Sequence, residues 1–75
     1  MATFKSNASD ALVMARSEII DIVSEAEQEL KELRDAGRYE ESPMAPYMLA
    51  RKVTALDALA AIDKAMAHVV AVNQA

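Results

Sequence analysis

Five carboxylates form the most regular polar pattern in this 75-residue sequence. They follow one another at spacings of three, four, four and three residues, which places them on one side of a helix: Glu18, Asp21, Glu25, Glu29 and Glu32. Such a carboxylate stripe could dock a basic partner or collect divalent cations, which prefer oxygen ligands. We predict a partner-binding surface, and the alternative is a solvated face that keeps the protein dispersed.

Residues for catalysis are sparse. The chain has one histidine, His68, and no cysteine, so thiolate zinc ligands are absent and no nucleophile, base and orienting group can be assembled. A di-iron bundle needs Glu-x-x-His motifs, whereas Ala65 stands three residues before His68. With Asp57 and Lys64, His68 forms a polar strip, where a surface role or a phosphate contact is expected. We expect a protein that is not an enzyme and binds no metal or cofactor.

A second candidate site combines arginine with tyrosine around the segment "GRYEESPMAPYM", residues 37–48. This segment holds the only glycine, both prolines and both tyrosines. Arginine can contact phosphate and tyrosine offers a stacking face, so the cluster suits a nucleotide or a protein partner. Alternatively, the tyrosines fasten the loop to the helix ends. The cluster comprises Arg34, Arg38, Tyr39, Tyr47 and Arg51.

The composition predicts an all-α protein. Hydrophobic residues make up 53% of the chain but aromatic residues only 4%, and alanine, leucine, isoleucine, valine and methionine supply the apolar mass. These residues favour helices over a sheet. We expect one small domain, 1–75, which without disulfides should depend on partner chains for stability.

The first helix is expected over residues 9–36, after a flexible N-terminus at 1–8. Asn7 and Ser9 are good N-cap residues, and Gly37 suits the left-handed position that ends a helix. Within this helix, apolar residues recur every three or four positions as one stripe: Leu12, Ala15, Ile19, Val23, Ala26, Leu30 and Leu33.

A joint at 37–42 leads to a second helix at 43–73. Ser42 followed by Pro43 is typical of an N-cap and the first helical residue, and Pro46 would fall in the first turn. Two long helices with a short connection should fold back on each other as an antiparallel hairpin.

The second helix is too apolar for a hairpin alone. Its apolar residues cover more than half of the helix circumference, and such a helix expects burial on several sides. We therefore predict self-association, most simply two hairpins forming a homodimeric four-helix bundle, or a higher oligomer. The expected oligomer interface is Leu49, Lys52, Leu56, Leu59, Ile62, Asp63, Met66 and Val70.

Two charges interrupt that apolar arc. Lys52 and Asp63 stand eleven residues apart, on nearly the same side of the helix. If two copies of the helix pack antiparallel, Lys52 of one chain would meet Asp63 of the other and fix the register. The alternative is that both side chains reach solvent at the edge of the core.

The charge and hydropathy patterns disfavour some classes of binding partner. A net charge of −4 disfavours nucleic acid, because phosphate neutralisation needs a basic surface. The first ten residues have no apolar core of a signal peptide, and no run is long enough to span a membrane. A cytoplasmic protein without membrane contact is expected.

Residues 52–67, "KVTALDALAAIDKAMA", resemble a helix of phage-encoded hairpin proteins that form oligomers and sequester cyclic-nucleotide defence signals. The shared run is Thr54, Leu56 and Asp57 followed by alanines, while Ile62 stands near the position of that family's tryptophan. The resemblance implies ligand contacts between chains from Lys52 and Thr54, with an arginine for the phosphate. Together with the joint, it yields the alternative ligand site Arg34, Arg38, Tyr39, Tyr47, Arg51, Lys52 and Thr54.

A second resemblance involves "ALVMAR" at residues 11–16 and the hairpin plan. Both are similar to plasmid copy-number regulators, which bind paired RNA loops as dimeric four-helix bundles. The resemblance implies RNA binding by the first helix, although the matching face here carries the carboxylate stripe.

These features favour a small acidic, non-catalytic protein that regulates or inhibits a partner protein as an oligomeric helical bundle. Many phage-encoded accessory proteins share this profile. The alternatives are an oligomer that sequesters a nucleotide signal at inter-chain pockets and an RNA-binding four-helix bundle.

Overall fold

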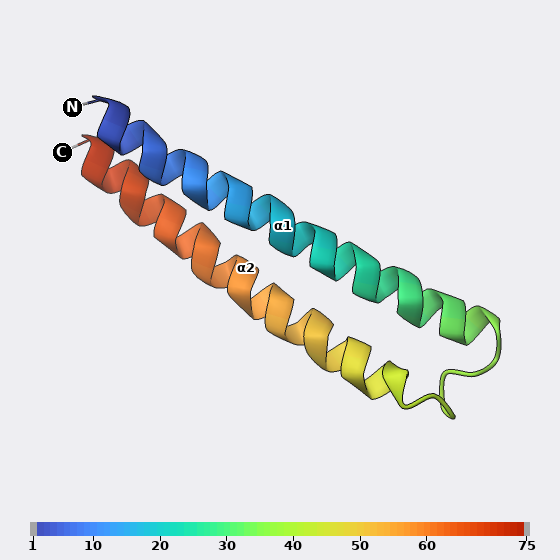
Figure 1. Ribbon diagram of the computed structural model, residues 1–75. Coiled ribbons are helices and arrows are strands. Elements are labelled where there is room, and N and C mark those ends of the chain that lie inside the picture. The colour runs from blue at the N-terminus through green and yellow to red at the C-terminus, as the bar shows by residue number, and fades with distance from the viewer. Residues whose placement is uncertain (1, 75) are drawn as a thin grey trace.

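The computed structural model describes the backbone of residues 2–74 and the side chains of residues 8–74. It contains two helices, α1 (Ala2–Asp35) and α2 (Met44–Gln74), which lie side by side and antiparallel (Figure 1). The molecule extends 55 × 15 × 14 Å and its radius of gyration is 16.9 Å. A compact chain of this length would have about 11 Å. The predicted all-α helical hairpin is confirmed, in a strongly elongated form.

The start of α1 differs from the expectation. The helix already includes residues 2–8, so the predicted beginning at residue 9 is wrong, and Asn7 and Ser9 lie inside the helix instead of capping it. No proline or glycine precedes Gly37, and asparagine and serine disfavour a helix interior only weakly. The expected flexible N-terminus is therefore helical over residues 2–8, and Met1 lies outside the described residues.

The end of α1 matches the prediction from Gly37. This glycine has a φ of 70°, the left-handed conformation that other residues rarely adopt. Its N–H donates to the carbonyl of Arg34 at 3.0 Å, and the N–H of Arg38 donates to the carbonyl of Leu33 at 2.8 Å. These two bonds form a Schellman motif, which satisfies carbonyls left open at the helix end.

The start of α2 also matches the predicted signal. The backbone N–H of Met44 donates to the hydroxyl oxygen of Ser42 at 3.1 Å, which is an N-cap bond. Pro43 directly follows the N-cap, where no N–H is needed, and the carbonyl of Ser42, which Pro46 cannot bond, accepts from the N–H of Ala45 at 3.3 Å. The helix is shifted by one residue from the predicted range 43–73.

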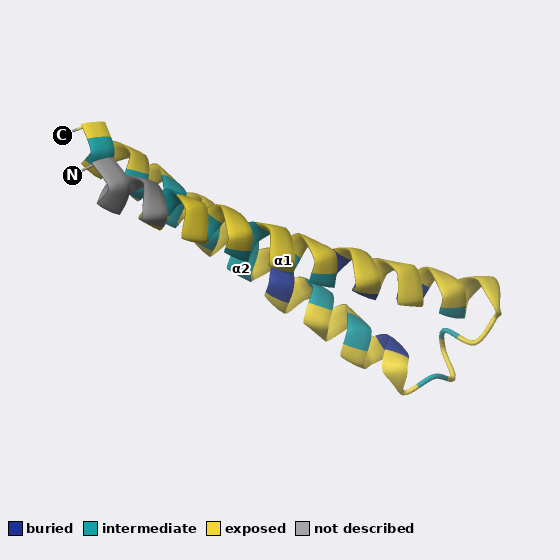
Figure 2. Cartoon of the chain, turned by 45° about the horizontal axis from the view of Figure 1, so that its top comes forward, coloured by how far each residue is buried: buried dark blue, intermediate teal, exposed yellow. Residues whose placement is uncertain are grey.

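The core between the helices is thin. Buried residues, dark blue in Figure 2, are Val23, Ala26, Leu30, Ala45 and Ala55. All seven residues of the predicted α1 stripe are buried or half-buried. The facing residues of α2 repeat every three or four positions and are likewise covered, and we call them the inner seam: Met48, Lys52, Ala55, Leu59, Ile62, Met66, Val69 and Asn73.

The inner seam includes half of the predicted oligomer interface. Lys52, Leu59, Ile62 and Met66 are half-buried within the single chain, where α1 is the element packed against them. Neither helix, over the described residues, has an apolar stretch long enough to cross a membrane.

Candidate functional site

A second row of residues runs along α2 beside the inner seam. It repeats at alternating spacings of four and three, and every member is exposed: Leu49, Val53, Leu56, Ala60, Asp63, Ala67 and Val70. The four large apolar members are 44% to 51% exposed. We call this row the outer seam. A helix with two adjacent heptad rows has the pattern of a bundle helix that contacts two neighbours.

The exposed apolar surface continues onto α1 near the open end of the hairpin. Val13 and Ile20 are exposed and, with Asp63 and Met66, line a hollow of about 560 Å³. Both helices therefore contribute apolar side chains to the outer-seam side of the hairpin. An exposed apolar row of this extent is typical of an interface.

Asp63 of the outer seam has a partner within the chain. The Nε of Arg16 donates to its Oδ1 at 2.9 Å, and both side chains remain substantially exposed. Arg16 is not among the residues predicted from the sequence, although it stands four residues after Leu12 and three before Ile19, at the spacing of the covered stripe. The proposed pair between Lys52 and Asp63 of two chains would have to compete with Arg16, and it stays a prediction.

The five residues of the carboxylate stripe are all exposed. Glu32 accepts a hydrogen bond from the amide nitrogen of Gln28 at 3.0 Å, but none of the five forms an ion pair with another described residue. Within the described part of the chain, no three carboxylate or histidine side chains are placed as ligands of one metal ion. The stripe is thus a continuous row of unpaired negative charge along α1.

An apolar groove of about 430 Å³ lies between the helices. Its α1 wall is Ile19 and Ile22, and the small side chains of Ala50, Ala55 and Ala58 leave the space opposite them. The rest of the lining, all on α2, is Tyr47, Arg51 and Thr54. Three residues of the alternative ligand site therefore converge here.

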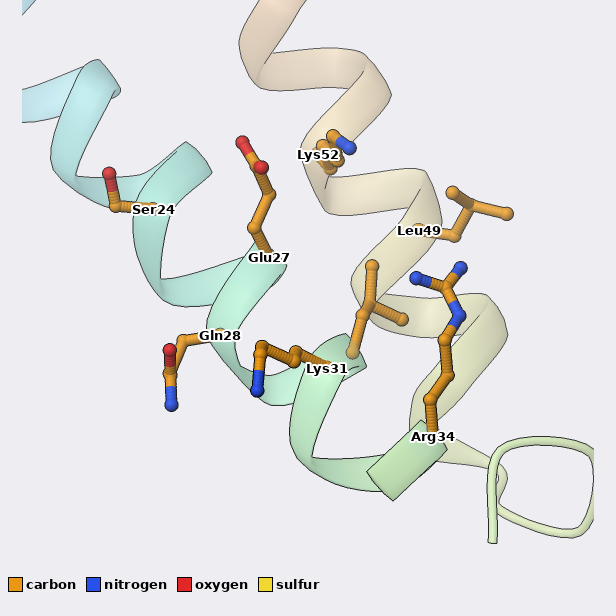
Figure 3. A pocket seen from close by; sticks show the side chains of 8 residues that line it. Ser24, Glu27, Gln28, Lys31, Arg34, Leu49 and Lys52 are labelled. Atoms are coloured by element: carbon orange, nitrogen blue, oxygen red, sulfur yellow. The ribbon is translucent and has the colours of Figure 1, made fainter. Parts of the chain in front are cut away.

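A polar groove of about 510 Å³ lies on the other flank of the helix contact and shares no residue with the apolar groove. Figure 3 shows Lys52 on its α2 wall, Glu27 on its α1 wall, and the guanidinium of Arg34 beside Leu49. Lys31 extends away from α2 (Figure 3). Its Nζ pairs with Oδ2 of Asp35 at 2.8 Å. The cations of this groove therefore do not converge on one point.

Arg34, near the end of α1, and Tyr39 of the joint contact each other. The guanidinium of Arg34 stacks over the ring of Tyr39, 4.6 Å from its centroid. This contact suits the structural interpretation of the joint, in which a tyrosine fastens the loop to a helix end. The predicted ligand residues are thus divided: Tyr47, Arg51 and Thr54 line the apolar groove, Arg34 and Lys52 line the polar groove, and Arg38 and Tyr39 line neither.

No protein-family model, no curated protein and no solved structure matches the chain.

Proposed function

We propose that this chain is a non-catalytic regulatory protein that acts as a homo-oligomeric helical bundle, most simply a dimer of hairpins, and binds a partner protein. The observation that carries the proposal is the outer seam, a complete heptad row that is exposed along the length of α2. Apolar heptad rows in water are stabilised by packing against another helix.

The exposed area of the hairpin supports this assembly. The chain exposes 5601 Å², whereas a compact monomer of 8.1 kDa would expose about 4,500 Å². The excess of about 1,100 Å² exceeds the roughly 800 Å² that each partner buries in a standard interface. A second copy would therefore cover about the area that the single hairpin leaves open.

The residue sizes along the outer seam favour antiparallel packing of two copies. If Ala60 of one α2 lies opposite Ala60 of the other, Val53 faces Ala67, Leu56 lies nearest Asp63 and Leu49 lies nearest Val70. Large side chains then meet small or medium ones, as interdigitation requires, and the contact is the same from either copy. The carboxylate stripe remains on the outside, available to a basic protein surface.

Sedimentation equilibrium or native mass spectrometry at micromolar concentrations tests the assembly. We expect twice the chain mass, with a concentration-dependent fall toward the monomer on dilution. A monomer at all concentrations would remove the outer seam as an interface and with it the proposed bundle.

A second candidate is an oligomer that sequesters a nucleotide, supported by the convergence of Tyr47, Arg51 and Thr54 in one groove. A stacking face, a cation and a hydroxyl suit a base and a phosphate. A ligand at a hundredfold excess over its Kd would stabilise the fold by about 2.7 kcal/mol, which a nucleotide thermal-shift screen would detect. RNA binding lacks comparable support, because the exposed face of α1 carries the carboxylate stripe.

A further inference from the structure

The apolar groove has the dimensions of a helix-docking site. It follows α2 from Tyr47 to Ala58, a rise of about 16 Å, or three helical turns. Apolar side chains at positions i, i+4 and i+7 of a partner helix span about 10 Å, so such a helix could place three anchors in it. The groove exists because alanines stop at Cβ, whereas Ile19 and Ile22 opposite them extend further.

The α1 rim of this groove is negatively charged. Ile22 shares a helix face with Glu18, Glu25 and Glu29, which stand four residues before it and three and seven residues after it. These three carboxylates are exposed and form no ion pair with described residues. Arg51 is exposed on the α2 rim. The two rims of the groove therefore differ in charge.

We infer that the apolar groove docks an amphipathic helix of the partner protein. The apolar face of that helix enters between the isoleucines and the alanines. Its basic flank pairs with Glu18, Glu25 and Glu29, and its other flank is neutral or acidic where it passes Arg51. This inference rests on the proposed function, because it names the kind of partner that the hairpin binds.

The same charges disfavour a nucleotide in the groove. Three unpaired carboxylates along one rim repel phosphate, and a single arginine on the other rim does not offset them. The lining between the rims is mostly alanine and isoleucine, which suits aliphatic side chains. A helix with a basic flank satisfies both the charge and the apolar lining.

The test measures, by fluorescence anisotropy, the binding of synthetic helical peptides of about fourteen residues to the full chain. The first peptide has leucines at positions i, i+4 and i+7, lysines on one flank and glutamines on the other. In the second peptide glutamates replace the lysines, and in the third glutamines replace the leucines. We expect binding of the first peptide only, weakened by added salt because the rim pairs are exposed.

Two variants locate the site. Ala50→Leu fills the groove from an exposed position, and Glu25→Lys with Glu29→Lys reverses its rim. Each should weaken binding of the first peptide about tenfold. The matched controls are Ala71→Leu, an exposed alanine of α2 that lines no described groove, and Glu40→Lys with Glu41→Lys in the joint. Both controls should bind like the original chain, and circular dichroism should show equal helix content throughout.

Equal binding by Ala50→Leu and the original chain would overturn the groove as the docking site, even if charge reversal still mattered. Absence of binding by the first peptide, or its displacement by a nucleotide, would also overturn the inference. The sedimentation mass is independent of these outcomes, so a dimer that ignores all peptides leaves the proposed assembly standing. A monomer that binds the first peptide would instead support the groove alone.

Discussion

Two sides of this hairpin are both exposed to solvent but differ in chemistry. On one side the outer seam of α2 presents leucine and valine, and on the other the carboxylate stripe of α1 presents exposed negative charge. Charged side chains are stable in water, whereas an apolar heptad row is stable only against another surface. Exposure in a single chain therefore does not distinguish a solvated surface from an interface that lacks its partner. Residue type and spacing do distinguish them.

The helices differ in the same way. On α1 one covered stripe faces α2, and most of the remaining circumference is polar, which is the pattern of a surface helix. On α2 the covered inner seam has an exposed apolar neighbour, which is the pattern of a helix between two partners. The asymmetry predicts that α2 forms the centre of the assembly and α1 its outside.

Leu56→Glu should have the largest effect on this comparison. It places a charge near the middle of the outer seam, and a dimer with twofold symmetry would bury it twice without a partner. We expect the dimer to weaken by about hundredfold, measured by sedimentation equilibrium. The control is Met14→Glu, which adds the same charge at an apolar residue that is 65% exposed and lies outside the outer seam. Dissociation by both variants would mean that net charge, and not the seam, governs assembly.

Added salt should affect binding at the two sides differently, with a smaller change than that of Leu56→Glu. Raising sodium chloride from about 0.05 M to about 0.5 M shortens the screening length several-fold, so pairing of a basic peptide with the carboxylate stripe should weaken about tenfold. Assembly through the outer seam is apolar and should stay unchanged or strengthen. Anisotropy and sedimentation on the same samples measure both. A parallel loss of the two would assign the carboxylates to the dimer contact.

Gly37→Ala should change the hairpin and leave both sides intact. An added Cβ would meet nothing within 4 Å, so the cost comes from the left-handed backbone, about 1 kcal/mol of unfolding free energy. Chemical denaturation measures it, and Gly37→Asn should lose less, because asparagine tolerates this conformation better. The dimer mass and peptide affinity should not change. An alanine variant as stable as the original would mean that the joint is relaxed by another backbone geometry.

Local signals in the sequence predicted most of the fold. Gly37 and Ser42-Pro43 predicted the position of the joint. Gly37 adopts the left-handed backbone conformation that ends a helix, and the hydroxyl of Ser42 accepts a bond from a backbone N–H at the start of the next helix. The N-terminal limit of α1 was missed because serine and asparagine are good caps but are also tolerated inside helices. A stop signal made by glycine is stronger than a start signal made by serine.

The candidate sites were less predictable, because they depend on how two helices are paired. Spacing along α1 was enough to place the carboxylates on one exposed face. The placement of Arg34 in one groove and of Tyr47 and Arg51 in the other depends on the rotation of α2 against α1, which spacing along one helix does not supply. Likewise, Arg16 and Asp63 are 47 residues apart and meet only in the antiparallel register.

The smallest predicted effect concerns that pair, which lies at the edge of the outer seam. Because both side chains are well exposed, Asp63→Arg should lower the unfolding free energy by only a few tenths of a kcal/mol through loss of the bond to Arg16. Arg16→Asp combined with Asp63→Arg should restore it within one chain. If Asp63 contacts Lys52 of the other chain, Asp63→Arg should also weaken the dimer, and Lys52→Glu combined with Asp63→Arg should restore it. Recovery of the unfolding free energy by Arg16→Asp would mean that Asp63 acts within the hairpin and that packing of the outer seam sets the register of the dimer. Recovery of the dimer by Lys52→Glu would mean that the charge pair between chains sets this register.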